Sequence, residues 1–193
     1  MGFLWTRKNN KTITMAKRTK MPGLAAKIID ARQKVYIGID NGVTGTIGII
    51  LGNDSIFVET PVFKQQNYTK KKANISRIDV VALKKILEPY QKLEVMVLLE
   101  RPMVNPKMLM ASFSAVRALE ATLGVIELLG YSYDYIDSKE WQKALLPKGS
   151  KGPQLKADSV SIACRLFAKH TDTIVRHKDG DGILIAEYCR RKF

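Results

Sequence analysis

Residues 35–51 read VYIGIDNGVTGTIGIIL, and this stretch decides the fold. Two apolar runs rich in β-branched residues are joined there by a turn that begins at Asp40, as two adjacent strands would be. A third run at 55–62 follows Gly52-Asn53, so the first three strands should form an antiparallel meander. Asp40 then lies where a strand ends. An aspartate at this point is either an ordinary turn former or a functional carboxylate, and this stretch alone leaves both open.

The remainder of the chain alternates between extended and helical patterns. A polar, basic segment at 64–77 is typical of a loop, and the fully apolar run at 95–99 is typical of a strand buried on both faces. Strands that alternate with helices after the meander predict an α/β sheet covered by helices, within one domain at 35–193. Residues 1–34 form a separate basic arm. The other elements that we expect are strands at 35–40, 46–51 and 132–137 and helices at 78–91, 109–129, 138–146, 154–169 and 181–192.

Positive charge dominates the composition. The chain has 32 Lys and Arg against 18 Asp and Glu, a net charge of +14, which favours a polyanionic partner such as nucleic acid. Its two cysteines, Cys164 and Cys189, lie in apolar helical patterns and are interpreted as core residues of an intracellular, reducing compartment. No apolar stretch approaches the ~20 residues that cross a bilayer, so we expect no membrane partner.

Two more carboxylates occupy positions similar to that of Asp40. Glu100 directly follows the apolar run VMVLL, and Asp181 opens the segment DGILIAEYCRR. Ligand sites in open α/β sheets lie beyond the carboxyl ends of strands, where Asp40 and Glu100 both fall. Each residue has an ordinary alternative role. Glu100 could pair with the adjacent Arg101, and Asp181 could simply interact with the dipole of a helix that begins there.

Residues around Asp181 suit a metal ion. His177 lies four residues before it, one helical turn, and Asp179 lies two residues before it, while Gly180 and Gly182 leave room for close approach. Carboxylates that are brought together repel one another, and a divalent cation resolves that conflict. An acidic, metal-ready cluster in a cationic chain predicts metal-dependent phosphodiester chemistry on nucleic acid.

Four segments resemble the RuvC-type Holliday junction resolvases, most closely their phage and organellar branch: GIDNGVTGTIGI, VLLERP, SFSAVRALEATLGVIELLGYSYDYIDSKEWQKALL and DGILIAEYCRR. The resemblance covers residues 35–192. It implies an RNase H-like fold, with a mixed five-stranded sheet of three antiparallel and two parallel strands flanked by helices. It also implies a homodimeric endodeoxyribonuclease that resolves four-way DNA junctions by paired symmetric nicks. Such a protein would act in the host cytoplasm if it is viral, and an organelle is the other location.

The same resemblance implies an active site. The family's first acid matches Asp40, its second matches Glu100, and the acid that opens its last helix matches Asp181. The fourth ligand, an acid or a histidine one turn earlier, falls on His177, with Asp179 as the alternative. Two Mg²⁺ or Mn²⁺ ions roughly 4 Å apart would be bridged by Asp40, with Glu100 on one and Asp181 on the other. One ion would activate water and the other would stabilise the leaving 3′ oxygen, which gives a 5′ phosphate and a 3′ hydroxyl.

DNA contacts need other groups, and lysines around the segment WQKALLPKGSKGPQ are the candidates. The loop after Glu100 resembles the family's junction-facing loop, so Met103 or Phe113 could insert between bases, although a core role fits Phe113 equally well. The apolar stripe of helix 109–129 suits the core or a dimer interface. The candidate phosphate-binding residues are Lys139, Lys143, Lys148, Lys151 and Lys156, of which Lys156 matches the family best and Lys143 next.

Three other interpretations compete. GIDNGVTG resembles the phosphate loop of ATP-binding sugar kinases and actin-like proteins, but that fold needs two such domains, and 193 residues are too few. A catalytically weak junction- or RNA-binding module of the same fold is the main alternative, and the three carboxylates argue against it. An RNase H that acts on hybrids is disfavoured by the C-terminal helix motif. Cleavage of four-way and hybrid substrates would separate these interpretations.

Overall fold

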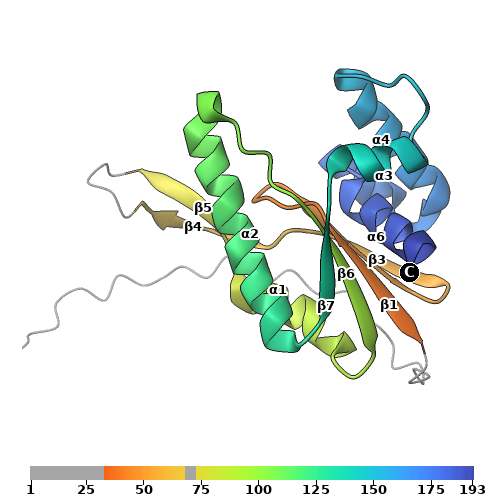
Figure 1. Ribbon diagram of the computed structural model, residues 1–193, viewed down its shortest axis with the longest axis horizontal. Helices are drawn as coiled ribbons and strands as arrows, with labels where there is room; N and C mark the ends of the chain where they lie inside the picture. Colours follow the sequence, from red (N-terminus) through yellow and green to blue (C-terminus); the bar gives the residue numbers. More distant parts are fainter. Residues whose placement is uncertain (1–32, 68–72) are drawn as a thin grey trace, which may run out of the picture.

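A computed structural model describes residues 33–67 and 73–193 (Figure 1). The predicted basic arm at 1–34 therefore lies outside the described residues, except for its last two. The central sheet has the strand order β3-β2-β1-β6-β7, with antiparallel pairing from β1 to β3 and parallel pairing among β1, β6 and β7. This confirms the predicted mixed five-stranded sheet. The strands are β1 (Lys34–Ile39), β2 (Thr46–Leu51), β3 (Asp54–Glu59), β6 (Glu94–Glu100) and β7 (Ser132–Ile136).

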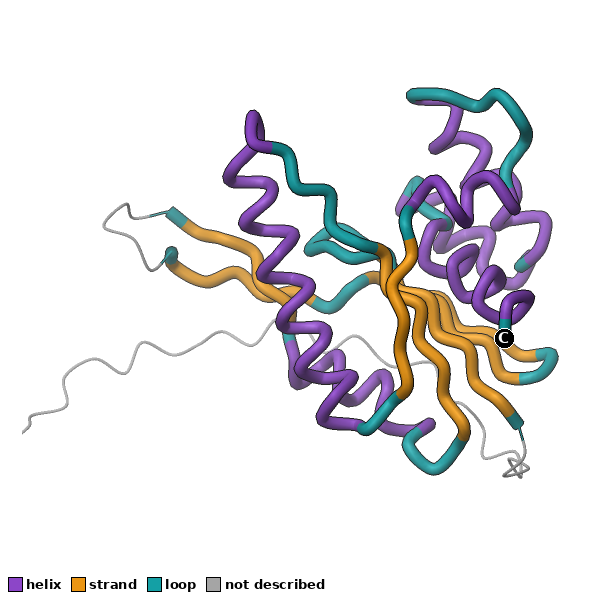
Figure 2. Tube along the Cα trace, in the orientation of Figure 1, coloured by secondary structure: helices purple, strands orange, loops and turns teal. Residues whose placement is uncertain are grey.

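Helices cover both faces of the sheet (Figures 1 and 2). α1 and α2 close a core over one face, which includes Ile37, Val97 and Ile126. α3, α4, α5 and α6 close a second core over the other face, around the fully buried Trp141 and Ile174. The helices are α1 (Val80–Leu87), α2 (Leu109–Leu129), α3 (Ser138–Leu145), α4 (Pro153–Leu166), α5 (Thr171–His177) and α6 (Asp181–Lys192), with 3-10 turns at Glu88–Tyr90, Pro106–Met108 and Ala168–His170.

Glycines bring α6 directly onto the backbone of β1 and β2. A Cβ atom at Gly38 would lie 2.1 Å from the backbone nitrogen of Ala186, and one at Gly48 would lie 2.3 Å from the nearest backbone atom of the same helix. On the helix side, a Cβ atom at Gly182 would lie 2.5 Å from the carbonyl oxygen of Thr46. Only residues without a side chain permit so close a contact. The first turn of α6 is thereby held beside the end of β1.

The segment predicted as a loop at 64–77 was the largest error of the sequence analysis. It overlaps β4 (Val62–Gln66) and β5 (Asn74–Ile78), which pair antiparallel as a separate two-stranded sheet. The predicted third strand at 55–62 is accordingly two strands, because β3 ends at Glu59 and β4 begins after Thr60-Pro61. Proline has no backbone N–H to donate, so it interrupts the pairing of a strand.

Helix boundaries also differ from prediction. α1 begins after Asp79, whose carboxylate accepts a bond of 3.0 Å from the backbone nitrogen of Ala82, and the proline at position 89 turns its end into a 3-10 turn. The helix predicted at 154–169 stops at Leu166, and a separate helix, α5, follows. α5 ends at His177, and the next residue, Lys178, has the left-handed φ of 56°. This break puts Asp179 in a short link between α5 and α6.

The helical segment Pro106–Leu129 is long and apolar enough to cross a membrane by length and composition alone. This corrects the expectation that no stretch approaches that length, although the core helix of a soluble protein passes the same test. About a third of the segment is buried, as Ile126 and Leu123 are, facing the sheet. Its N-terminal half exposes Met110 and Phe113 instead, at 70% and 56%. Phe113 is therefore not a core residue.

Candidate metal centre

Three aspartates converge at the carboxyl end of β1. Asp40 directly follows β1, Asp181 is the first residue of α6, and Asp179 lies in the link before it. One carboxylate oxygen from each lies within 4.8 Å of the others. The backbone fixes this arrangement, because the nitrogen of Asp40 donates to the carbonyl oxygen of Thr46 at 3.0 Å and α6 packs on the same strands. Asp40 is thus more than a turn former.

Glu100 ends β6, the strand beside β1, and its carboxylate lies near enough to the aspartates for their negative charges to repel one another. The indole nitrogen of Trp141 donates to Glu100 Oε2 at 3.1 Å. The alternative salt bridge to Arg101 is not formed, because the guanidinium of Arg101 pairs with Asp137 at 3.1 Å and lies over the ring of Tyr135. Glu100 is therefore not held by Arg101; it lies beside the aspartates, although it is not one of the three whose oxygens lie within 4.8 Å of one another.

Hydroxyl and backbone groups orient the two acids of the α5–α6 region. The hydroxyl of the fully buried Thr46 donates to Asp179 Oδ1 at 3.3 Å and accepts from the nitrogen of Gly182 at 3.0 Å. Asp179 Oδ1 also accepts from the nitrogen of Asp181 at 2.8 Å, and the hydroxyl of Ser159 donates to Asp181 Oδ1. These bonds engage Oδ1 of each aspartate, and Oδ2 of each pairs with Lys156.

Burial and mutual repulsion oppose the charged form of these carboxylates. The pKa of Asp40 is raised well above its usual range, first by burial and then by repulsion from Asp179, Glu100 and Asp181. Burial also raises the pKa of Glu100 to about 7, despite the bond from Trp141, which lowers it. The pKa of Asp181 is raised for the same two reasons, burial and the charge of Asp179. A divalent cation with a preference for oxygen ligands would relieve this repulsion, so the donor set fits Mg²⁺ or Mn²⁺.

Lys156 supplies positive charge at the cluster. Its Nζ lies 2.5 Å from Asp179 Oδ2 and 3.2 Å from Asp181 Oδ2, and half of its side chain is exposed. Burial alone would lower the pKa of Lys156, but the two carboxylates raise it above the usual value. α4 presents this lysine at the mouth of the site, beside a hollow between α4 and α5 lined by Val160, Val175 and Lys178.

His177 does not join the aspartates. Its Nε2 pairs with the carboxylate of Glu59 at the end of β3. The prediction relied on helical spacing between His177 and Asp181, whereas α5 ends at His177 and α6 begins at Asp181, so no helical turn joins them. Of the two alternatives for the fourth ligand, the structure brings Asp179 to the cluster.

The residues predicted to bind DNA lie on the surface around this end of the sheet. Met103 follows β6 in the loop before α2 and is 81% exposed. Phe113 is exposed on the second turn of α2. The candidate lysines are all exposed, on α3 for Lys139 and Lys143, in the α3–α4 loop for Lys148 and Lys151, and on α4 for Lys156.

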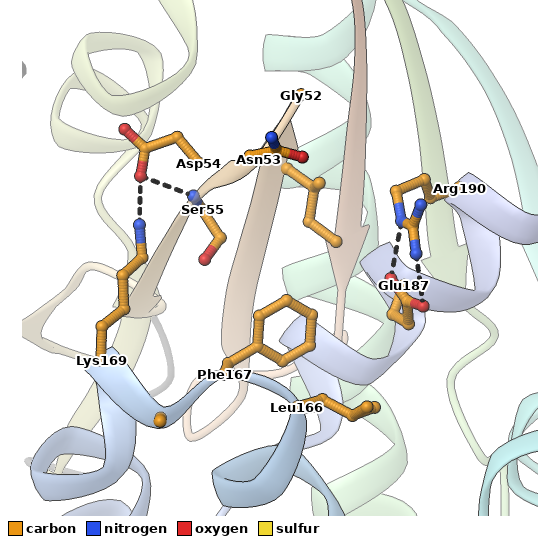
Figure 3. A pocket seen from close by; sticks show the side chains of 11 residues that line it. Gly52, Asn53, Asp54, Ser55, Leu166, Phe167, Lys169, Glu187 and Arg190 are labelled. Carbon is orange, nitrogen blue, oxygen red and sulfur yellow. Dashed lines mark hydrogen bonds and ion pairs between the residues drawn. The ribbon is translucent and has the colours of Figure 1, made fainter.

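A second pocket, of 330 Å³, lies at the opposite end of the sheet (Figure 3). It is lined by the β2–β3 turn, the end of α4 and the end of α6. Its charged groups pair with one another: Lys169 with Asp54, and Arg190 with Glu187 at 2.8 Å. Because these groups neutralise each other and no carboxylate cluster lies among the described residues there, the metal centre remains the stronger candidate site.

Comparison with solved structures bears on the fold. A T. thermophilus RuvC structure, determined in complex with a Holliday junction substrate, aligns with 82% of this chain and 96% of its own length, at 12% identity and a TM-score of 0.50. The chain has the RuvC fold. Another Thermus thermophilus RuvC structure aligns over the same shares at 16% identity with a TM-score of 0.44. No protein-family model matches the chain, and no curated protein sequence matches it.

Three residues that orient the carboxylates of this RuvC fold were not predicted from the sequence. Thr46, Trp141 and Ser159 contact Asp179, Glu100 and Asp181, respectively. Thr46 has a sequence signal, because it opens β2 directly opposite the end of β1. Trp141 and Ser159 lie on α3 and α4, and nothing in their spacing indicates that they meet a carboxylate.

Proposed function

We propose that this protein is a divalent-metal-dependent endonuclease that resolves four-way DNA junctions. The observation that carries the proposal is the cluster of Asp40, Asp179 and Asp181, with Glu100 beside it, at the carboxyl end of a RuvC-fold sheet. Carboxylates that repel one another when no cation is present are typical of sites that hold metal ions for phosphodiester hydrolysis.

In this proposal the four carboxylates hold two Mg²⁺ or Mn²⁺ ions. A divalent ion supplies a nucleophile from water at neutral pH and stabilises the charge on the leaving oxygen. Trp141 and Thr46 keep Glu100 and Asp179 turned towards the site. Lys156, which is half exposed, is placed to neutralise a DNA phosphate that enters beside the cluster. Hydrolysis would leave a 5′ phosphate and a 3′ hydroxyl.

Branched DNA is the proposed substrate, because the surface around the site is cationic. Five exposed lysines lie on α3, on α4 and in the loop between them, and their neutralisation of phosphates would release counterions. One solved structure with this fold holds a Holliday junction substrate, which is a property of that protein. The two cysteines, Cys164 and Cys189, are free thiols, in agreement with the reducing, intracellular compartment that we propose.

We also propose a homodimer, since paired symmetric nicks need two sites related by a two-fold axis. The exposed apolar side chains at the start of α2 form the candidate interface, because a monomer rarely exposes so many together. Sedimentation at micromolar concentration should give a dimer, and a fully active monomer would reject this part of the proposal. The exposed side chains are Met108, Leu109, Met110, Phe113 and Val116.

The test is cleavage of a labelled four-way junction in Mg²⁺ or Mn²⁺, with linear duplex, forked DNA and an RNA–DNA hybrid as controls. Symmetric nicks in the junction, absent without metal, are the expected result. Asp40→Asn, Glu100→Gln and Asp181→Asn should each abolish cleavage and leave junction binding unchanged or tighter. Glu94→Gln is a matched control for Glu100→Gln, since Glu94 lies at the other end of β6 and forms a surface ion pair with Lys34. Near-normal cleavage by any of the three variants would refute the site.

One observation favours a second candidate function. Nζ of Lys156 bridges Asp179 and Asp181, where it neutralises charge that a metal ion would otherwise balance. A module that binds junctions but cuts them weakly, or not at all, would have this property. The same assay separates the two functions, because such a module would bind the four-way junction tightly and leave it intact in saturating Mn²⁺.

A further inference from the structure

The β4–β5 pair extends from the body beside α2 (Figures 1 and 2). Every residue of β4 is exposed, and only Ile78 of β5 is buried. An isolated two-stranded hairpin is marginally stable in water, and here only the base of the pair, at Ile78, reaches the core. Such a structure gains stability when a partner covers one of its faces.

The root of this pair lies beside the metal centre. The nitrogen of Thr60 donates to the carbonyl oxygen of Gly45 at 3.0 Å, and a Cβ atom at Gly45 would lie 2.1 Å from the carbonyl oxygen of Asp40. β4 begins two residues after Thr60. Strands of five residues then reach about 16 Å from that point, or roughly five base-pair steps along one DNA strand.

The two faces of the pair differ in chemistry. Phe63 and Arg77 are paired in register on one face, where the guanidinium lies 5.9 Å from the ring centroid. On the other face, the two pairs farthest from the body of the protein are Lys64 with Ser76 and Gln66 with Asn74. We call these four residues the polar face. All four side chains carry hydrogen-bonding groups, and no acidic residue occurs at the described positions from 60 to 78.

This chemistry and shape match the groove of duplex DNA. The major groove is about 12 Å wide and admits a two-stranded β-ribbon. Amide side chains read base edges, and lysine and serine side chains contact phosphates. We propose that the polar face of the β4–β5 pair binds an arm of the DNA substrate next to the cleavage point. The inference rests on the proposed function and names a second DNA-binding element, distinct from the lysines of α3 and α4.

Protection of an exposed edge also uses lysine, so the charge of Lys64 has an alternative explanation. Edge protection would not require Gln66, Asn74 and Ser76 to accompany it on the same face. A second copy of this chain is a less suitable partner for the polar face, because the apolar side chains at the start of α2 supply the surface that such a contact favours.

The experiment measures binding of the full chain to a fluorescent four-way junction without divalent metal, over 50–200 mM salt. Lys64→Ala should weaken binding and reduce the slope of log K against log salt by about 0.9 per lost phosphate contact. Lys64→Arg should restore that slope. The double variant Gln66→Ala/Asn74→Ala should weaken binding several-fold with an unchanged slope. Lys92→Ala is the matched control, since Lys92 is an exposed lysine in the turn before β6.

The outcomes separate this inference from the proposed function. If the wild-type protein binds and cuts the junction while Lys64→Ala has the wild-type slope and affinity, only the role of the β4–β5 pair is refuted. If the wild-type protein neither binds nor cuts any branched DNA, the proposed function fails. A change in the monomer–dimer equilibrium of the Gln66→Ala/Asn74→Ala variant, with DNA binding unaltered, would also overturn the inference and make the polar face a subunit contact.

Discussion

Replacement of Trp141 by phenylalanine would test whether an outer contact controls the metal centre. The change keeps an aromatic ring in a fully buried position and removes one N–H group, which donates to Glu100 Oε2 at 3.1 Å. Hydrogen bonds to charged groups contribute about 1.5–3 kcal/mol, and loss of a residue that orients a metal ligand typically costs about 10–100-fold in affinity. Ser138 also bonds the Glu100 carboxylate, so we expect the lower end, about tenfold.

The assay is titration of the DNA-free protein with Mn²⁺, followed by electron paramagnetic resonance of free Mn²⁺, alongside single-turnover cleavage. Trp141→Phe should bind Mn²⁺ about tenfold more weakly and cut slowly at low Mn²⁺, with recovery at high Mn²⁺. Tyr188→Phe is a matched control, because it removes a bond of 2.7 Å to Glu140 in the same half of the molecule. Wild-type Mn²⁺ affinity in a folded Trp141→Phe protein would refute the argument that this contact positions Glu100.

Four other predictions follow from the site and the lysines around it. Asp179→Ala should slow cleavage more than His177→Ala, measured as single-turnover rates, because only Asp179 lies with the aspartates; the opposite order would restore His177 as the fourth ligand. Since burial raises the pKa of Glu100 to about 7, its proton competes with metal, and Mn²⁺ affinity should fall as pH drops from 8 to 6. A raised pKa also means that the charged carboxylate of Glu100 destabilises the folded state above pH 7. Metal-free Glu100→Gln should therefore be more stable than wild type at pH 8, by up to about 3 kcal/mol in the free energy of urea unfolding. Neutralising Lys143 or Lys151 should lower the slope of log K for junction binding against log salt by about 0.9 per lost phosphate contact, without altering which sequence is cut. If these variants keep the wild-type slope, the DNA-binding surface lies elsewhere on the protein.

The sequence was sufficient for the sheet because its strands are short, apolar and separated by clear turns. Asp40 and Glu100 could be placed at the carboxyl ends of two strands from this pattern alone, and the structure shows that these strands are adjacent and parallel. The β4–β5 pair was not predictable in the same way. Its residues are largely polar and lack a regular alternation of apolar side chains, because only Ile78, at its base, belongs to a core.

The fourth ligand shows a different limit. Spacing of four residues suggested that His177 and Asp181 share a helix face, but the chain leaves the helix at Lys178 through a left-handed conformation. Such a conformation is uncommon for lysine, and no local signal marks it. The contact between Trp141 and Glu100 was equally unpredictable from the sequence, because it joins α3 to the end of β6 through tertiary packing.

The glycine contacts between α6 and the sheet have a consequence for how the protein matures. Asp40 and Asp181 are far apart in the sequence, and they meet only when α6 has docked on β1 and β2. Contacts between such distant residues require closure of a long loop and form late in folding. A partly folded chain, even one with a complete sheet, would hold Asp40 and Glu100 without the other two acids. Metal affinity would then appear together with the finished fold, so an incompletely folded molecule would not cut DNA.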